Sequence, residues 1–190
     1  VKRIEDVDLM RTYQFPEDEG PTSHPIQPQS YLQINNFYTV TIYDKGAEVI
    51  RMIHTLLGPE KFRKGMDKYF ELFDGMAVTT EDFIHAMELG GDIDLKQFRN
   101  WYFQKGTPKL SVQSHYDPEK KQVKLVTKQE LESEEKAYFF PFKIALYDKQ
   151  TNQAVCSSSN STHEHQLIIN QKEQSFTFDN VDNPCNLSLN

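Results

Sequence analysis

The spacing of apolar residues changes once along this chain, at Lys105-Gly106-Thr107-Pro108. Before this point apolar side chains recur every three or four residues, which predicts amphipathic helices. After it they alternate with polar ones, which predicts strands. Helices followed by strands indicate an α+β fold. Residues 1–106 are therefore expected to form a helical part, and residues 107–190 a small antiparallel β-sandwich.

A helix is predicted after Tyr43 from five apolar positions at helical spacing: Ala47, Ile50, Ile53, Leu56 and Leu57. Thr41 and Asp44 stand three residues apart before this run, as in a capping box, where each side chain accepts a hydrogen bond from a backbone N–H. Tyr43 would then lie in a first helical turn, where the helix dipole favours negative charge nearby. Gly58 is expected to end the helix, and Pro59 to begin the next one.

The helix that begins at Pro59 carries a stripe of large side chains that is predicted to lie in the core: Phe62, Met66, Tyr69, Phe70 and Phe73. Thr79 and Asp82 predict a second capping box, and Gly90-Gly91 is expected to end that helix. Asp94 is expected to cap a last helix, which would bury four large side chains: Leu95, Phe98, Trp101 and Tyr102.

The first 34 residues predict one or two helical turns and then a long connection. This connection is interrupted by five residues that disfavour regular structure: Pro16, Gly20, Pro21, Pro25 and Pro28. We expect no regular structure there, and disorder over residues 14–30. A connection of this length is usually functional or wrapped over a surface, and both interpretations stay open.

Short alternating runs with polar turns between them predict the strands. The first begins at Leu110 and turns back at Asp117–Glu119. The charged stretch Gln129–Lys136 is predicted to be a solvated loop, and the strongest alternation follows over Phe140–Leu146. Alternation still runs in Leu187–Asn190, so the last strand is either truncated or just complete. Shorter strands are expected near residues 154–156, 166–169 and 175–178.

The acidic balance of the chain argues against two classes of partner. A net charge of −7 and a pI near 5.4 disfavour a nucleic-acid backbone and an anionic membrane surface. No apolar run approaches the ~18 residues that a membrane span needs. The charged N-terminal residues 1–10 lack the apolar core of a signal peptide. The sequence has no initiator Met and starts inside a periodic pattern of Val1, Ile4, Val7 and Met10, which suggests a piece cut from a longer chain. Cys156 and Cys185 are either free thiols in a reducing compartment or one disulfide.

Two short strings carry a resemblance to a known family. Asn35–Tyr38 has the sequence Asn-Asn-Phe-Tyr, and Tyr43–Ala47 has Tyr-Asp-Lys-Gly-Ala. Together they resemble the zinc aminopeptidases of the aminopeptidase N family, and most of all its bacterial branch. The resemblance continues at Gly106–Pro108, Phe140–Phe142 and Phe178–Val181. It implies the helical C-terminal part of a thermolysin-like catalytic domain, followed by a β-sandwich domain.

For an intact protein the resemblance implies a zinc-dependent, cytoplasmic and monomeric enzyme that removes N-terminal amino acids from peptides. The chain would then contact the missing N-terminal, zinc-site and C-terminal helical domains of the same protein. The string His-Glu-x-x-His, which supplies two zinc ligands and a general base, does not occur in these 190 residues. We therefore expect this stretch to bind no zinc and to be inactive alone.

The resemblance also assigns roles to two tyrosines. It implies that the Tyr43 hydroxyl donates a hydrogen bond to the oxyanion of the tetrahedral intermediate. Tyrosine suits this role because its O–H stays protonated at neutral pH. For Tyr38 two interpretations stay open, namely lining of the substrate pocket and packing in the core. The resemblance further suggests that the connection before Asn35 lies near the active-site cleft.

Two alternatives are kept beside these expectations. The whole chain could be a non-catalytic binding or scaffold module, a helical bundle fused to a sandwich. Upstream sequence would discriminate, since an enzyme needs His-Glu-x-x-His shortly before Val1. His163 and His165 lie two residues apart, and they could form a surface metal pair or belong to an exposed polar loop.

Overall fold

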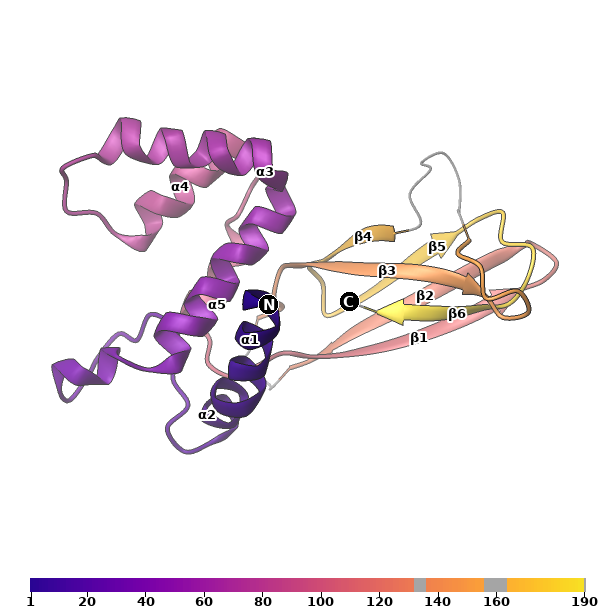
Figure 1. Cartoon of the computed structure of the whole chain (residues 1–190), viewed down its shortest axis with the longest axis horizontal. Coiled ribbons are helices and arrows are strands. Elements are labelled where there is room, and N and C mark those ends of the chain that lie inside the picture. Colours follow the sequence, from indigo (N-terminus) through magenta and orange to yellow (C-terminus); the bar gives the residue numbers. More distant parts are fainter. Residues whose placement is uncertain (132–135, 156–163, 190) are drawn as a thin grey trace. The chain divides into compact units, whose positions relative to one another are not determined.

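The chain divides into two compact units, Val1–Thr107 and Pro108–Asn190. The computed structural model describes residues 1–131, 136–155 and 164–189. The first unit is built of helices and the second of strands (Figure 1). The α+β fold expected from the change in spacing is confirmed. The assignment of residues 1–106 and 107–190 to domains of a larger enzyme stays a prediction.

Short helical segments and two long helical elements make up the first unit. The described elements are α1 (Lys2–Leu9), η1 (Met10–Gln14), α2 (Phe15–Glu19), η2 (Ile34–Phe37), η3 (Thr41–Lys45), α3 (Gly46–Phe73), α4 (Thr80–Gly91), η4 (Gln97–Arg99) and α5 (Asn100–Phe103). The segments η1 and η3 are π-helical turns, and η2 and η4 are 3-10 turns.

The long element α3 is two helices joined at a kink. Gly58 has φ 72° and ψ 167°, a backbone conformation that interrupts a helix and that glycine adopts without a steric cost. Pro59 follows directly, where a new first turn has no use for its missing N–H. The prediction of a helix end at Gly58 and a new start at Pro59 is confirmed.

One predicted capping box is confirmed and the other is wrong. At the start of α4, the Asp82 carboxylate accepts hydrogen bonds from the Thr79 backbone N–H at 2.7 Å and from its hydroxyl at 2.8 Å. Thr41 makes no such pair with Asp44. Its hydroxyl and backbone N–H instead donate to Glu17, 24 residues earlier. A tertiary partner thus replaces the local one.

The core of the first unit joins α3, α4 and the stretch from Leu95 through α5. Its most buried side chains are Val49, Ile53, Leu57, Ile84, Ala86, Met87, Leu95, Phe98, Trp101 and Tyr102. The predicted burial of Leu95, Phe98, Trp101 and Tyr102 is therefore confirmed. The single helix capped by Asp94 is wrong, because a 3-10 turn that begins at Gln97 and the short helix α5 replace it, and neither has a side-chain cap. The aromatic stripe of α3 is less buried than predicted, and Phe70 is 57% exposed. The ring of Tyr69 instead packs at the edge of this core, 5.5 Å from the ring of Phe83.

The helices α3 and α4 approach closely at a pair of glycines. A Cβ atom built on Gly90 would lie 2.2 Å from the backbone nitrogen of Gly65 and 2.4 Å from its Cα. Real Cβ atoms do not come this close to backbone, so neither helix leaves room for a side chain at Gly90. Gly90 was predicted from sequence as a helix end, whereas the structure shows that it is also the contact point of two helices.

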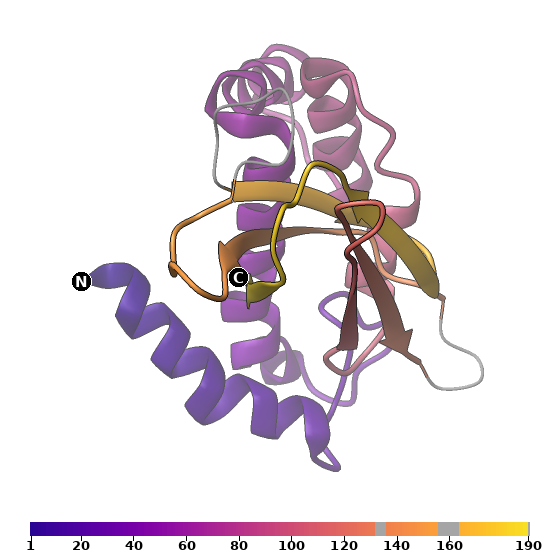
Figure 2. The same ribbon diagram turned by 90° about the vertical axis from the view of Figure 1, so that its right-hand side faces the viewer.

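Two three-stranded antiparallel sheets make up the second unit, and Figure 2 looks along their strands. One sheet has the order β1 (Lys109–Asp117), β2 (Gln122–Glu130), β5 (Glu173–Phe178), and the other has the order β4 (Glu164–Ile169), β3 (Phe140–Asp148), β6 (Cys185–Leu189). Inward side chains of both sheets form one core, which includes Leu125, Ile144, Leu146 and Ile169. The expected β-sandwich is confirmed.

The predicted loop Gln129–Lys136 is wrong at its start, because Gln129 is a fully buried residue of β2. Its side-chain amide donates to the backbone carbonyls of Tyr138 at 2.9 Å and Gln171 at 3.1 Å. Its side-chain oxygen accepts from the Tyr138 N–H at 2.9 Å. One amide side chain thus joins three segments of the unit. Residues 132–135 of the predicted loop lie outside the described residues.

Replacing Gln129 with Leu is expected to destabilise the second unit by about 2–4 kcal/mol. The substitution keeps the volume roughly constant but removes three buried hydrogen bonds. Hydrogen exchange of the β2 amides measures the loss, and Lys128→Leu on the same strand is the control, because Lys128 is exposed. Equal protection in both variants would show that the Gln129 amide contributes nothing specific.

A cluster of ion pairs in the first unit joins Arg99 of η4 to α4. The Arg99 guanidinium lies 3.0 Å from one oxygen of Glu88 and 2.6 Å from an oxygen of Glu81. The same Glu88 oxygen accepts from the Leu95 N–H at 2.9 Å. Burial acts to raise the pKa of Glu88, but the hydrogen bonds from Arg99 and Leu95 outweigh it. The net pKa of this carboxyl therefore lies below its ordinary 4.5.

Glu88→Gln is expected to destabilise the first unit at pH 7 and to have little effect near pH 3. A lowered carboxyl pKa contributes stability above the ordinary value of 4.5, and this stability is lost as pH falls through the lowered pKa. The expected loss at pH 7 is about 1 kcal/mol. Fluorescence of Trp101, the single tryptophan of the chain, follows unfolding in this unit. Glu81→Gln is the control, because Glu81 is more exposed, and an equal loss at both pH values would contradict the assignment.

Candidate functional site

Tyr43 lies in the middle of the π-helical turn η3, directly before the long element α3. Its side chain is 60% exposed, and that of Tyr38 is 69% exposed. The two rings stack with a centroid distance of 6.1 Å and an interplanar angle of 23°. Packing in the core, one of the two interpretations of Tyr38, is therefore wrong. Two neighbouring phenol rings face solvent at this point.

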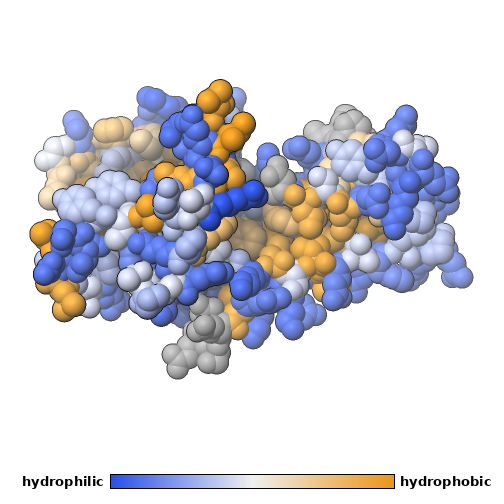
Figure 3. Space-filling view, turned by 60° about the horizontal axis from the view of Figure 1, so that its bottom comes forward, coloured by the Kyte–Doolittle hydropathy of each residue, from blue (hydrophilic) through white to orange (hydrophobic). Residues whose placement is uncertain are grey.

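The segment that leads to Tyr43 is rich in exposed apolar side chains. Tyr31, Leu32 and Ile34 are 55%, 97% and 66% exposed. Figure 3 shows hydrophobic residues, in orange, among hydrophilic ones on one face of the molecule. Exposed aromatic and aliphatic groups of this kind can contact the apolar parts of a ligand.

The first anchor of η3 is the carboxylate of Glu17 in α2. One oxygen of Glu17 accepts from the Thr41 backbone N–H at 3.0 Å and from the Thr41 hydroxyl at 2.6 Å. The Gln14 side chain donates to the same hydroxyl at 3.3 Å. Thr41 and Gln14 are completely buried. The start of the turn that carries Tyr43 is thus fixed to α2 by charge-assisted hydrogen bonds.

The second anchor is a buried ion pair. The Lys45 ammonium lies 2.7 Å from one carboxylate oxygen of Asp18, and the two side chains are 6% and 0% exposed. The same ammonium donates to the Gly106 carbonyl at 2.8 Å, and the Thr107 hydroxyl donates to the same Asp18 oxygen at 2.8 Å. Three stretches far apart in sequence therefore meet at Asp18.

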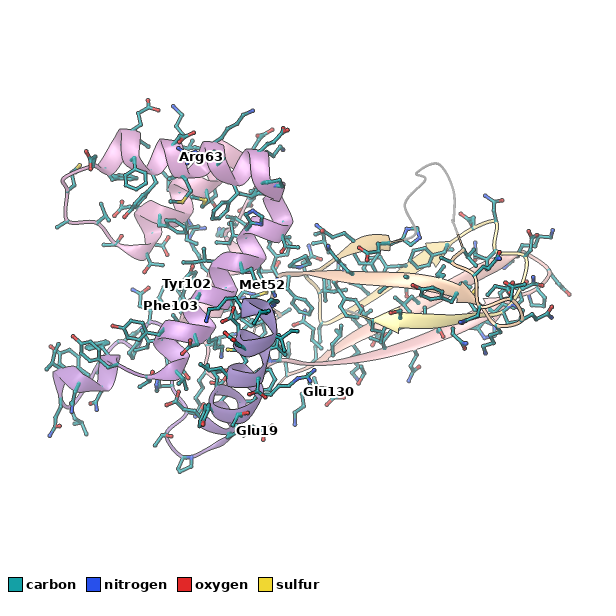
Figure 4. All side chains as sticks on the ribbon, in the orientation of Figure 1. Glu19, Met52, Arg63, Tyr102, Phe103 and Glu130 are labelled. Carbon is teal, nitrogen blue, oxygen red and sulfur yellow. The ribbon has the colours of Figure 1, made fainter. Side chains whose placement is uncertain are left out.

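The connection before Asn35 is tied to the rest of the unit. Gln27 donates its backbone N–H to the carbonyl of Tyr102 at 2.9 Å, and Ile26 is buried. Tyr102, labelled in Figure 4, is itself buried, and burial raises the pKa of its phenol to about 12. The prediction of disorder over residues 14–30 is wrong, because α2 and these contacts lie within that range. Pro16 is accommodated in the first turn of α2.

Two buried acceptors at the anchors lack a hydrogen-bond donor among the described residues. They are the second carboxylate oxygen of Asp18 and the side-chain oxygen of Gln14. Buried acceptors are normally paired with protein or with ordered water.

Two charged side chains close to Tyr43 in sequence, Lys45 and Glu48, are already paired within the protein. Lys45 is buried against Asp18, so its charge does not face solvent. Glu48 in the first turn of α3 accepts from Arg3 and, at 3.0 Å, from Arg51. The hydroxyl of Tyr43 makes no hydrogen bond to any residue that the structure describes. It is therefore a neutral O–H donor that is available to a ligand.

The described residues supply no zinc site. No group of three or more His, Cys, Asp or Glu side chains among them could hold a metal ion. His163 of the predicted histidine pair lies outside the described residues, and the ring of His165 packs 5.1 Å from the ring of Phe178. The prediction that this stretch binds no zinc stays a prediction.

Tyr43 and Tyr38 were predicted from the sequence, and their roles stay predictions, but the buried residues that anchor η3 were missed. Glu17 and Asp18 stand in a stretch that was expected to be disordered, and no buried partner was expected for Lys45. Nothing in the local pattern marks these three side chains as buried partners.

Among the described residues, no helix is both long and apolar enough to cross a membrane.

Comparison with known families matches residues 4–102 to the peptidase family M1 domain. Residues 106–190 match a domain of unknown function with an Ig-like fold. The chain is 46% identical over 186 residues to an aminopeptidase N of Escherichia coli, and 43% identical over 186 residues to an aminopeptidase N of Haemophilus influenzae. Each match covers 95% of this chain and 21% of the relative, so the chain spans about a fifth of their length.

A solved structure shows the same arrangement of elements. The crystal structure of Legionella pneumophila aminopeptidase A in complex with aspartic acid matches with a TM-score of 0.76 and 28% sequence identity. The match covers 90% of this chain and 19% of that one. The helical unit and the sandwich thus recur together in a much longer protein.

Proposed function

This chain belongs to peptidase family M1, and we propose that it forms part of an aminopeptidase that hydrolyses N-terminal residues from peptides. The relatives named aminopeptidase N support the reaction class. The match over 95% of the chain supports the assignment of the same reaction class to an enzyme that contains this chain. Because the chain spans 21% of those relatives, the activity is proposed for a complete enzyme that contains this chain.

The observation that carries the proposal is the exposed and unpaired hydroxyl of Tyr43 on an anchored turn. Attack of water on a peptide carbonyl converts it into a tetrahedral intermediate with a negatively charged oxygen. A neutral O–H donor at about 2.7–3.1 Å from this oxygen stabilises the charge as it develops. We propose that Tyr43 is this donor, and that its exposed position lets it reach a substrate bound by other parts of the enzyme.

Tyr38 is proposed to line the substrate pocket beside Tyr43. Its ring is exposed and stacks on the Tyr43 ring, so a substrate that reaches the Tyr43 hydroxyl also passes Tyr38. A stacked aromatic neighbour limits the directions in which the Tyr43 ring can turn. We therefore propose Tyr38 as a binding residue and not as a proton or charge carrier.

Zinc dependence is also part of the proposal. The described residues offer no metal site, so the ligands of the zinc ion would come from other parts of the complete enzyme. We also propose that the complete enzyme is cytoplasmic and monomeric, and that this chain contacts its zinc-site and C-terminal helical domains. On this proposal the chain by itself has no peptidase activity.

The test is the activity of a complete enzyme that contains this chain with Tyr43 replaced by Phe, measured on an alanyl chromogenic amide together with zinc content. A large loss of kcat/KM at full zinc occupancy supports the proposal. Retained activity removes the catalytic role of Tyr43. This stretch would then be the scaffold module that the sequence left open as an alternative.

A further inference from the structure

We infer that the buried ion pair of Asp18 and Lys45 is a positioning device that holds Tyr43 in its reactive place. This inference rests on the proposed function of Tyr43. Asp18 and Lys45 would set the rate of the reaction without touching substrate, because both side chains are buried.

Tyr43 cannot position itself through its own side chain. It is 60% exposed, and its described ring contact is with Tyr38, which is 69% exposed. The direction of the Tyr43 hydroxyl therefore depends on the backbone of η3. A π-helical turn is a rare conformation that occurs frequently at functional sites, and it needs support from the surrounding structure.

That support comes from the two residues that flank Tyr43 at equal distance along the chain. Thr41 stands two residues before it and Lys45 two residues after it, and they are 0% and 4% exposed. On a helical turn, residues two positions apart point to roughly opposite sides. The hydroxyl of Tyr43 thus faces solvent because both of its flanking side chains are held inside.

Both flanking residues are held by the same short helix. Glu17 of α2 binds Thr41, and Asp18 of α2 binds Lys45 at 2.7 Å. The end of the unit adds two further contacts, from Lys45 to the Gly106 carbonyl and from Thr107 to Asp18. The turn η3 is therefore fixed at both ends against α2 and against the residues that follow α5.

The free-energy cost of burying two charges indicates that this pair serves to position the backbone more than to stabilise the fold. Each charge loses several kcal/mol of hydration on burial, and an apolar pair of similar volume is often as stable or more so. A buried pair with matched hydrogen bonds instead restricts the backbone to one arrangement. Lys45 donates to two acceptors and Asp18 accepts from two donors, so a shift of either segment breaks several bonds at once.

The test is a cycle of substitutions in a complete enzyme that contains this chain. The paired change Asp18→Asn with Lys45→Met removes both charges and leaves no uncompensated buried ion. It is expected to lower kcat about 10-fold to 100-fold, with KM changed less than about twofold, because a displacement of about 1 Å can cost this much. In the Tyr43→Phe background the same paired change is expected to cost less than about twofold, because the group it positions is gone.

Two outcomes would overturn the inference. One is an equal loss of kcat in both backgrounds, which would make the pair a general structural element. The other is a folded enzyme with the paired change and unaltered kcat. If Tyr43→Phe itself has no effect, the proposed function fails instead, so the two failures are distinguishable.

A milder variant and a matched control complete the design. If the paired change prevents folding, Thr41→Val removes the hydroxyl bonded to Glu17 and is expected to lower kcat about 3-fold to 10-fold, again only when Tyr43 is present. Loss of kcat by Thr41→Val in both backgrounds would overturn the inference. Arg99→Met with Glu88→Gln removes another ion pair of the same unit and is expected to change stability but not kcat.

Discussion

Tyr43→Phe is expected to lower kcat/KM of a complete enzyme that contains this chain by about 10²-fold to 10³-fold, or about 2.7–4 kcal/mol of transition-state stabilisation. The substitution removes one oxygen and leaves the ring that stacks on Tyr38. Because Tyr43 is 60% exposed and lies outside the core, the fold is expected to be unchanged. The loss should appear in kcat, since the oxyanion exists only after attack on the carbonyl.

Tyr13→Phe is the control for this experiment. Tyr13 is 63% exposed and lies in η1 of the same unit, so the same chemical change is made at an exposed phenol outside η3. It is expected to leave kcat/KM within about twofold of the parent enzyme. Zinc content measured in both variants separates a lost donor from a lost metal. Equal activities of the two variants would contradict the role of Tyr43.

Gly90→Ala is expected to destabilise the first unit by about 3 kcal/mol, at the upper end of the usual cost of overpacking. The new Cβ would lie 2.2 Å from the backbone nitrogen of Gly65, and backbone cannot rotate away as a side chain can. The helices α3 and α4 would have to separate along their contact. The buried side chains Ile84, Met87 and Ile53 would then lose part of their packing. Urea unfolding followed by the fluorescence of Trp101 measures the loss.

Gly46→Ala is the matched control for the close contact. Gly46 is also buried within a helical stretch, but a Cβ atom there would lie 3.7 Å from the nearest atom, in Ile26, an ordinary contact. Alanine favours a helix over glycine by about 1 kcal/mol, so this substitution is expected to be neutral or stabilising. Equal destabilisation by both substitutions would show that the loss of a glycine, and not the contact with Gly65, is responsible.

Much of the architecture could be predicted from local pattern. The change of spacing at Lys105–Pro108 predicted helices before strands, and the two units divide at Thr107 and Pro108. Gly58 and Thr79 were predicted as a helix end and a helix cap, and both are confirmed. These features are local, because a glycine conformation or a capping side chain depends on residues within one turn.

Features that depend on distant partners could not be predicted in this way. Thr41 was expected to pair with Asp44, three residues away, and instead bonds Glu17. Gln129 was expected in a solvated loop and instead joins three segments of the sandwich. In each case the fold supplies a partner that the local pattern does not show.

The sequence by itself determined the order of helices and strands, the two tyrosines of the candidate site, and the family to which the strings around them point. Only the tertiary structure decided which face of the turn is buried. Asp18 and Lys45 are 27 residues apart, and nothing in their neighbours indicates that they meet. A charged residue is normally exposed, and it becomes buried only when folding brings an opposite charge and matching hydrogen bonds to it. That meeting is what leaves the Tyr43 side chain facing solvent.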